Sequence, residues 1–221
     1  MTRTIVIGGV GPTLGESLAR EFAAAGDSVA LWARSESFTA ELAATLSAET
    51  PGSAIATRVD VTDREAIADG VERVHEAFGR VDAYVHNVAP DKAWNGPLTD
   101  EPADFATYVE AAGYGLVAVV EELLGELRAA GGTVIHHAAD DMRWVSRAMA
   151  EQLTAEGVHV VRVVADGWID GPTVSEDVPD SKRIDPDTLA AEYRRLIEQD
   201  RSVWSSDVDF RAWGDDAFRT G

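Results

Sequence analysis

The chain has 221 residues, enough for a full hydrophobic core, and we expect one domain over residues 1–221. A formal net charge of -20 argues against nucleic acid as a partner, because affinity for nucleic acid rests on Lys and Arg neutralising phosphates. The absence of cysteine excludes disulfides and thiolate metal sites, and no apolar run approaches the roughly 20 residues of a membrane span.

The first predicted elements are a strand, a glycine-rich turn and a helix. Thr4–Ile7 is a short β-branched strand, the turn Gly8-Gly9-Val10-Gly11 follows at once, and a helical apolar stripe runs on to Gly26. Glycines let a backbone approach a pyrophosphate, and a helix N-terminus offers free N–H groups with a partial positive charge. This order therefore predicts a dinucleotide-binding turn, although a glycine-rich turn that binds nothing has the same local pattern.

Strands and helices then alternate to the end of the chain. Further strands are predicted at Ser28–Ala33, Ala54–Val59, Val81–His86, Thr133–His137, Val158–Val164 and, last, Ser202–Phe210. Helices are predicted at Ser35–Glu49, Asp63–Phe78, Ala103–Ala130, Asp140–Ala155 and Asp187–Gln199, with loops over Ala89–Pro102 and around Pro172 and Pro179. The alternation predicts an α/β, doubly wound parallel sheet of the Rossmann type in three α/β/α layers.

The charge and the N-terminus suggest a cellular setting. Met1-Thr2-Arg3 leads directly into a strand without a signal peptide, so we expect a cytoplasmic protein that does not enter a membrane. Lysine occurs only at Lys92 and Lys182. A surplus of carboxylates with so few lysines suggests a halophilic surface that salt screens, and an acidic protein from an arginine-rich organism is the alternative.

Several motifs together resemble the short-chain dehydrogenase/reductase family over essentially the whole chain. In the family's Thr-Gly-x-x-x-Gly-x-Gly motif, Gly8 takes the Thr place, Gly9 and Gly15 match, Leu14 lies between the glycines, and Thr13 replaces the middle Gly. The other matching segments are Asp60-Val61, Asn87-Val88-Ala89-Pro90, Asp166-Gly167-Trp168-Ile169, the helix from Ser146 to Leu153, and the tail from Ser202 to Trp213.

The resemblance implies a nicotinamide dinucleotide cofactor and assigns residues to it. Asp60 and Val61 would face the adenine, and the backbone of Ile169 would meet the nicotinamide amide. Thr13 either crowds the pyrophosphate with its Cβ or bonds a phosphate through its hydroxyl. The end of the second strand carries Arg34 in place of the acidic residue of NAD-preferring members, so NADP(H) is favoured over NAD(H).

The family's catalytic residues are missing from this chain. No Tyr is followed four residues later by Lys, and alignment back from Ser146-Arg147 places the expected Tyr inside the fifth strand. The loop with the family's Ser is reduced to Ala138-Ala139, and the family's Asn falls at Ala112. His137 or Asp140 could replace the family's Tyr as the proton donor. The plainer interpretations are a structural role for His137 at the end of a strand and a helix cap for Asp140.

Three hypotheses follow. The first is an NADP(H)-binding protein that has lost the family's oxidoreductase chemistry, and the second is an active oxidoreductase with a site rebuilt near the fifth strand. The third is a scaffold or partner subunit that binds no nucleotide. The resemblance also implies a homodimer or homotetramer, assembled through the long helix at Ala103–Ala130 and the helix at Asp140–Ala155.

Overall fold

Runs of β-branched and small apolar residues form a central sheet whose strands are covered on both faces. In the computed structural model, which describes residues 2–89 and 98–214, seven strands lie in the order β3-β2-β1-β4-β5-β6-β9, and every neighbouring pair is parallel. The strands are β1 (Thr4–Gly8), β2 (Ser28–Ala33), β3 (Ser53–Arg58), β4 (Ala83–His86), β5 (Thr133–His137), β6 (His159–Asp166) and β9 (Asp207–Arg211). The predicted doubly wound parallel sheet is confirmed.

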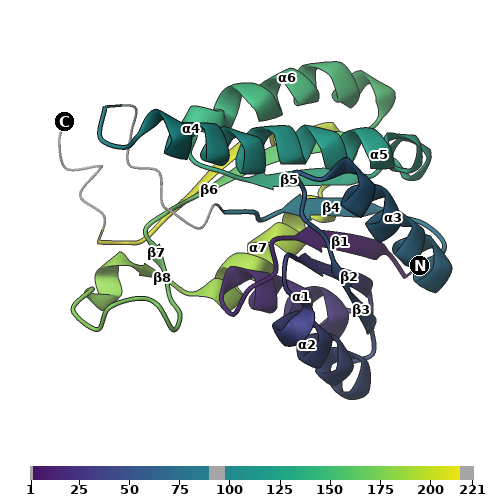
Figure 1. Ribbon diagram of the computed structural model, residues 1–221, viewed down its shortest axis with the longest axis horizontal. Coiled ribbons are helices and arrows are strands. Elements are labelled where there is room, and N and C mark those ends of the chain that lie inside the picture. The colour runs from purple at the N-terminus through teal and green to yellow at the C-terminus, as the bar shows by residue number, and fades with distance from the viewer. Residues whose placement is uncertain (1, 90–97, 215–221) are drawn as a thin grey trace.

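Helices cover the two faces of the sheet and complete three layers. The helices are α1 (Leu14–Ala24), α2 (Glu36–Glu49), α3 (Arg64–Phe78), α4 (Pro102–Val109), α5 (Gly115–Ala130), α6 (Arg143–Leu153) and α7 (Pro186–Ile197). Figure 1 shows α4, α5 and α6 on one side of the sheet and α1, α2 and α7 on the other. The strand order reverses between β1 and β4. Doubly wound sheets bind ligands at the carboxyl ends of the strands beside such a reversal, and we call this place the crevice.

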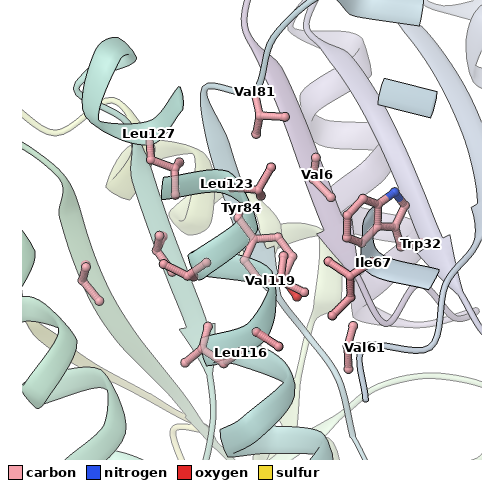
Figure 2. Packing of buried hydrophobic residues seen from close by; sticks show 14 of the residues in the cluster. Val6, Trp32, Val61, Ile67, Val81, Tyr84, Leu116, Val119, Leu123 and Leu127 are labelled. Atoms are coloured by element: carbon pink, nitrogen blue, oxygen red, sulfur yellow. The ribbon is translucent and has the colours of Figure 1, made fainter. Parts of the chain in front are cut away.

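Each layer of helices has its own apolar core. One core joins α1, α2 and α7 to the sheet, and the other joins α3, α5 and α6 to the opposite face. In the second core, shown in Figure 2, Tyr84 lies among the side chains of Val119 and Leu123 on α5 and of Trp32 on β2. Trp32 and Tyr84 are fully buried, so two large aromatic rings support the strands that end at the crevice.

The predicted long helix is interrupted where it passes the crevice. It consists of α4, one π-helical turn at Glu110–Tyr114, and α5. The prediction of one regular helix over Ala103–Ala130 was therefore wrong in detail. An apolar pattern does not reveal a single extra residue in a turn, and such π turns occur often at functional sites.

The C-terminal third also differs from the prediction. The last strand begins at Asp207 rather than Ser202, because the Asp200 carboxylate accepts hydrogen bonds from Ser202 and starts a 3₁₀ turn. The helix α7 begins at Pro186, capped by Asp185, and ends at Ile197. The predicted loop contains two short strands, β7 (Trp168–Ile169) and β8 (Arg183–Ile184), which pair in parallel.

None of the described helices is both long and apolar enough to cross a bilayer.

Candidate functional site

The glycine-rich turn holds two strand ends together at the crevice. The N–H groups of Gly9 and Val10 both donate to the carbonyl of Trp32, and the Asn87 side-chain amide donates to the Gly9 carbonyl at 2.9 Å. Gly9 has φ of +83°, and a Cβ there would lie 2.4 Å from the Asn87 carbonyl oxygen. Only glycine fits this position, so the contact between the turn and the end of β4 depends on Gly9.

The start of α1 packs closely against the glycine-rich turn. A Cβ on Gly15 would lie 2.8 Å from the Val10 Cα, so Gly15 lets α1 pack directly on the turn. Leu14, the first residue of α1, is buried in the core. A Cβ on Gly11 would meet nothing within 4 Å, so the space above this part of the turn is open. A helix N-terminus beside open space suits a pyrophosphate.

Thr13 contacts the segment that follows β7. A Cβ on Gly171 would lie 2.3 Å from the Thr13 Cγ2. The methyl group of Thr13 therefore faces Gly171, and the segment after β7 closes one side of the glycine turn. Ile169, the last residue of β7, is half-buried and paired with Ile184 of β8.

The predicted adenosine residues lie at the ends of β2, β3 and β4. Arg34 is exposed just after β2. One carboxylate oxygen of Asp60 accepts from both the N–H and the hydroxyl of Thr62, at 3.0 and 2.8 Å. The Val61 side chain is buried against Gly115 of α5, which leaves its backbone for a nucleotide. Ala89 is exposed, and the predicted motif residue Pro90 lies outside the described residues.

The two histidines at the end of β5 point to opposite faces, as strand alternation predicts. The Nδ1 atom of His136 lies 2.6 Å from the hydroxyl of Ser146 on α6. The Nδ1 atom of His137 lies 2.5 Å from the hydroxyl of Tyr193 on α7. Burial lowers the pKa of His137 to about 4, and burial lowers the pKa of His136 well below its usual value. Both rings are therefore neutral at pH 7, and His137 has no imidazolium proton to donate to a substrate.

A third histidine, which sequence reasoning missed, connects the glycine turn to the π turn. The Nε2 atom of His86 lies 3.0 Å from the carbonyl oxygen of Ala111, which can only accept. The ring therefore donates from Nε2, and its Nδ1 accepts from the Tyr84 hydroxyl at 2.7 Å. A Cβ on Gly8 would lie 2.7 Å from the same hydroxyl oxygen, so Tyr84 fills the place of a larger residue at position 8.

The connection from β5 to α6 is short, as expected. Ala138 and Ala139 lead into a 3₁₀ turn at Asp140–Met142, and α6 begins at Arg143. The Tyr108 hydroxyl donates to the Asp141 carboxylate at 2.6 Å, and burial together with this bond raises the pKa of the phenol. The Asp140 side chain lies outside the described part of the structure. Ala112, at the predicted place of the family's Asn, lies in the π turn.

Known proteins resemble this chain in sequence and in structure. A family model described as enoyl-(acyl carrier protein) reductase matches residues 9–145. The short chain dehydrogenase mpl6 of Monascus purpureus is 35% identical over 113 residues, which make up 48% of this chain and 38% of that protein. A short chain dehydrogenase of Pseudocercospora fijiensis is 38% identical over 102 residues, covering 46% of this chain and 32% of its own length. The chain thus spans less than half of these relatives.

Two solved structures share the fold over nearly the whole chain. An alcohol dehydrogenase from the archaeon Thermococcus sibiricus, complexed with 5-hydroxy-NADP, has a TM-score of 0.84 at 22% identity and covers 97% of this chain and 99% of its own. The L-sorbose reductase from Gluconobacter frateurii, complexed with NADPH and L-sorbose, has a TM-score of 0.83 at 20% identity and covers 97% of both chains. Since the family model matches more than half of the sequence, the chain belongs to the short-chain dehydrogenase/reductase family.

Proposed function

We propose that this chain binds NADP(H) in the crevice at the carboxyl ends of β1 and β4, and that it has lost the family's Ser-Tyr-Lys carbonyl chemistry. The turn supports binding, because Gly9 and Gly15 allow close backbone approach and the space above Gly11 is open. The NADP derivatives in the Thermococcus and Gluconobacter structures support the choice of cofactor. Bound NADPH would supply a hydride.

The observation that carries the loss of chemistry is the short connection between β5 and α6. Only Ala138, Ala139 and one 3₁₀ turn separate β5 from Arg143, so the chain has no segment there to hold a Tyr and a Lys in the family's places. A positioned general acid is worth about 10²- to 10⁴-fold in rate. The described side chains beside this connection are already engaged, since Tyr108 donates to Asp141 and His137 is neutral beside Tyr193.

The proposal predicts tight NADPH binding without turnover. Nicotinamide fluorescence should rise and saturate on titration with NADPH, more tightly than with NADH. NADPH oxidation over a panel of ketones and aldehydes should stay at the background rate. Gly9→Val, which pushes a side chain into the Asn87 carbonyl, should abolish NADPH binding. Gly11→Ala places a Cβ in open space, so this variant should fold like the wild type.

The alternatives give different results. Absence of binding by the folded protein would support the scaffold hypothesis. Turnover that disappears in His137→Ala would support a rebuilt oxidoreductase site near β5.

We also propose that the chain forms a homodimer or homotetramer through α4, α5 and α6. Large apolar side chains on these helices and on the π turn between α4 and α5 are exposed: Phe105, Tyr114, Val117 and Trp144. An exposed apolar surface of this kind suits association with a second copy.

A further inference from the structure

A cavity lies between α6 and the edge of the sheet that β6 and β9 form. Its volume is about 650 Å³, within the range of about 300 to 1,000 Å³ that is usual for sites of small organic ligands. One wall is the exposed side of α6, and the other is the middle of β6 with the start of β9. In the sheet, β5 separates β6 from β4, so this cavity is not part of the crevice at β1 and β4. We call it the α6 pocket.

The α6 pocket gathers positive charge in a strongly acidic protein. Among the described residues that line it, three arginines, Arg143, Arg147 and Arg162, stand beside two carboxylates, Glu151 and Asp207. The whole chain has the opposite balance, with 19 basic and 39 acidic residues. Two of the arginines are four residues apart on α6, a spacing at which like charges repel each other. This arrangement favours a ligand that brings negative charge.

Arg162 gives the α6 pocket a fixed, charged floor. Only 2% of its surface is exposed, and its Nε and Nη2 both contact the Asp207 Oδ1, at 2.8 and 2.6 Å. The parallel register places these two residues opposite each other. On the facing wall, the hydroxyl of Ser146 lies 2.6 Å from the Nδ1 of His136. Because these groups are already held in place, they lose little freedom when a ligand binds.

Arg143 and Arg147 lie at the rim of the pocket and can turn toward a ligand. The Nε of Arg147 donates to the Glu151 Oε1 at 3.1 Å, and both side chains are mostly exposed. The Nε of Arg143 lies 2.7 Å from the Asp207 Oδ2, and the arginine side chain is 59% exposed. Exposed pairs of this kind contribute little to stability, so a ligand that replaces Glu151 at Arg147 costs little. Both pairs use Nε, and the Nη groups can donate to ligand oxygens.

We propose that the α6 pocket binds a small organic anion through a carboxylate or phosphate group, which Arg143 and Arg147 hold above the buried charge of Arg162. The planar fork of a guanidinium matches the oxygens of either group. Ala150 and Ala155 also line the pocket, and their methyl groups offer contact to the apolar body of the ligand. None of the lining residues belongs to the crevice, so this binding would survive a failure of the cofactor proposal.

Calorimetric titration of the full-length protein at one low, fixed salt concentration tests the proposal. The probes are benzoate, phenyl phosphate and inorganic phosphate. We expect benzoate or phenyl phosphate to bind at one site per chain, and the tighter of the two identifies the preferred oxyanion group. Inorganic phosphate should bind more weakly than phenyl phosphate, because it has no apolar body to contact the two alanines.

Two pairs of variants locate the binding. Arg147→Glu should weaken it at least about 10-fold, because hydrogen bonds to a charged group are lost. Arg73→Glu makes the same charge change in an exposed pair with Glu76 on α3 and should alter the dissociation constant less than about twofold. Thr154→Trp narrows the pocket without changing its charge and should also weaken binding. Gln152→Trp, at an exposed position of α6 that does not line the pocket, should not.

Three results would overturn the proposal. The first is no binding of either aromatic anion by the folded wild-type protein. The second is an equal loss in Arg147→Glu and Arg73→Glu, which would show a diffuse effect of net charge. The third is an affinity that falls as the protein concentration rises, which would mean that a second copy of the chain fills the pocket. If Arg147→Glu does not fold, the comparison of Thr154→Trp with Gln152→Trp decides in its place.

Discussion

At the scale of single residues, the buried histidines connect the site to the stability of the fold. Burial lowers the pKa of His86 and His137 to about 4, and it lowers the pKa of His136 and His159 as well. His86 bridges Tyr84 and the π turn only as a neutral ring, because its Nδ1 must accept a hydrogen bond. Protonation would break this bridge below the crevice.

Stability should therefore fall as the pH falls from 7 toward 4. The folded-state pKa lies below the unfolded value of about 6.5, so the unfolded chain binds more protons in this range. For His86 alone the shift corresponds to roughly 3 kcal/mol when the full range is crossed. Urea denaturation between pH 7.5 and 5 measures how steeply the free energy of unfolding changes with pH. His86→Asn keeps one donor and one acceptor without titrating and should flatten the slope, and a pH-independent wild type would contradict this account.

The glycine positions and the lack of a Tyr-x-x-x-Lys pair could be read from the sequence, because both are local, whereas the loss of catalysis stays a prediction. Gly9 follows a β-branched strand directly, and the absence of Lys four residues after any Tyr is a matter of spacing. The contacts of His86 with the Ala111 carbonyl and of His136 with Ser146 could not be predicted. They depend on how the helices pack against the strands, and no local pattern in the sequence reports that packing.

At the scale of elements, the turn before α1 and the segment after β7 are coupled through one contact. Gly171 has no room for a Cβ, because the Thr13 methyl group occupies the space. Gly171→Ala should therefore lower the free energy of unfolding by about 1–3 kcal/mol through overpacking. Thr13→Gly removes the obstructing methyl group, so the double variant should recover most of this loss.

Urea unfolding of the two single variants and the double variant measures the coupling. If the changes in free energy of unfolding of the two single variants add up to that of the double variant within about 0.5 kcal/mol, the two segments do not touch in solution.

The order of strands and helices could be predicted because apolar periodicity reports it, whereas the exceptions arise from tertiary contacts. The π turn at Glu110–Tyr114 lies where the carbonyl of Ala111 meets His86, a contact between segments far apart in sequence. The strands β7 and β8 have two residues each, which is too short for any periodic signal. The last strand begins at Asp207 rather than at the predicted Ser202, because the Asp200 side chain caps a 3₁₀ turn there.

At the scale of the whole molecule, apolar exposure and net charge act in opposite directions on association. The exposed side chains on α4, α5 and α6 favour pairing, while two chains with a net charge of -20 repel each other. We therefore predict an oligomer that strengthens as salt rises from about one tenth molar to about 1 M, where the Debye length falls from about 10 to 3 Å.

Sedimentation velocity across this salt range checks the assembly. Val117→Glu on α5 should shift the population to monomer, and Val203→Glu, an equally charged change on a 3₁₀ turn elsewhere, should not. A monomer at every salt concentration would contradict the proposed assembly.

Our central proposal is that the crevice still binds NADPH although the connection after β5 lacks the family's catalytic residues. The most direct measurement follows NADPH fluorescence through a titration to saturation and then through the addition of a carbonyl panel. We predict an enhancement that saturates at one NADPH per chain and stays constant after the carbonyls are added. Either no enhancement with folded protein, or an enhancement that decays as alcohol forms, would contradict this prediction.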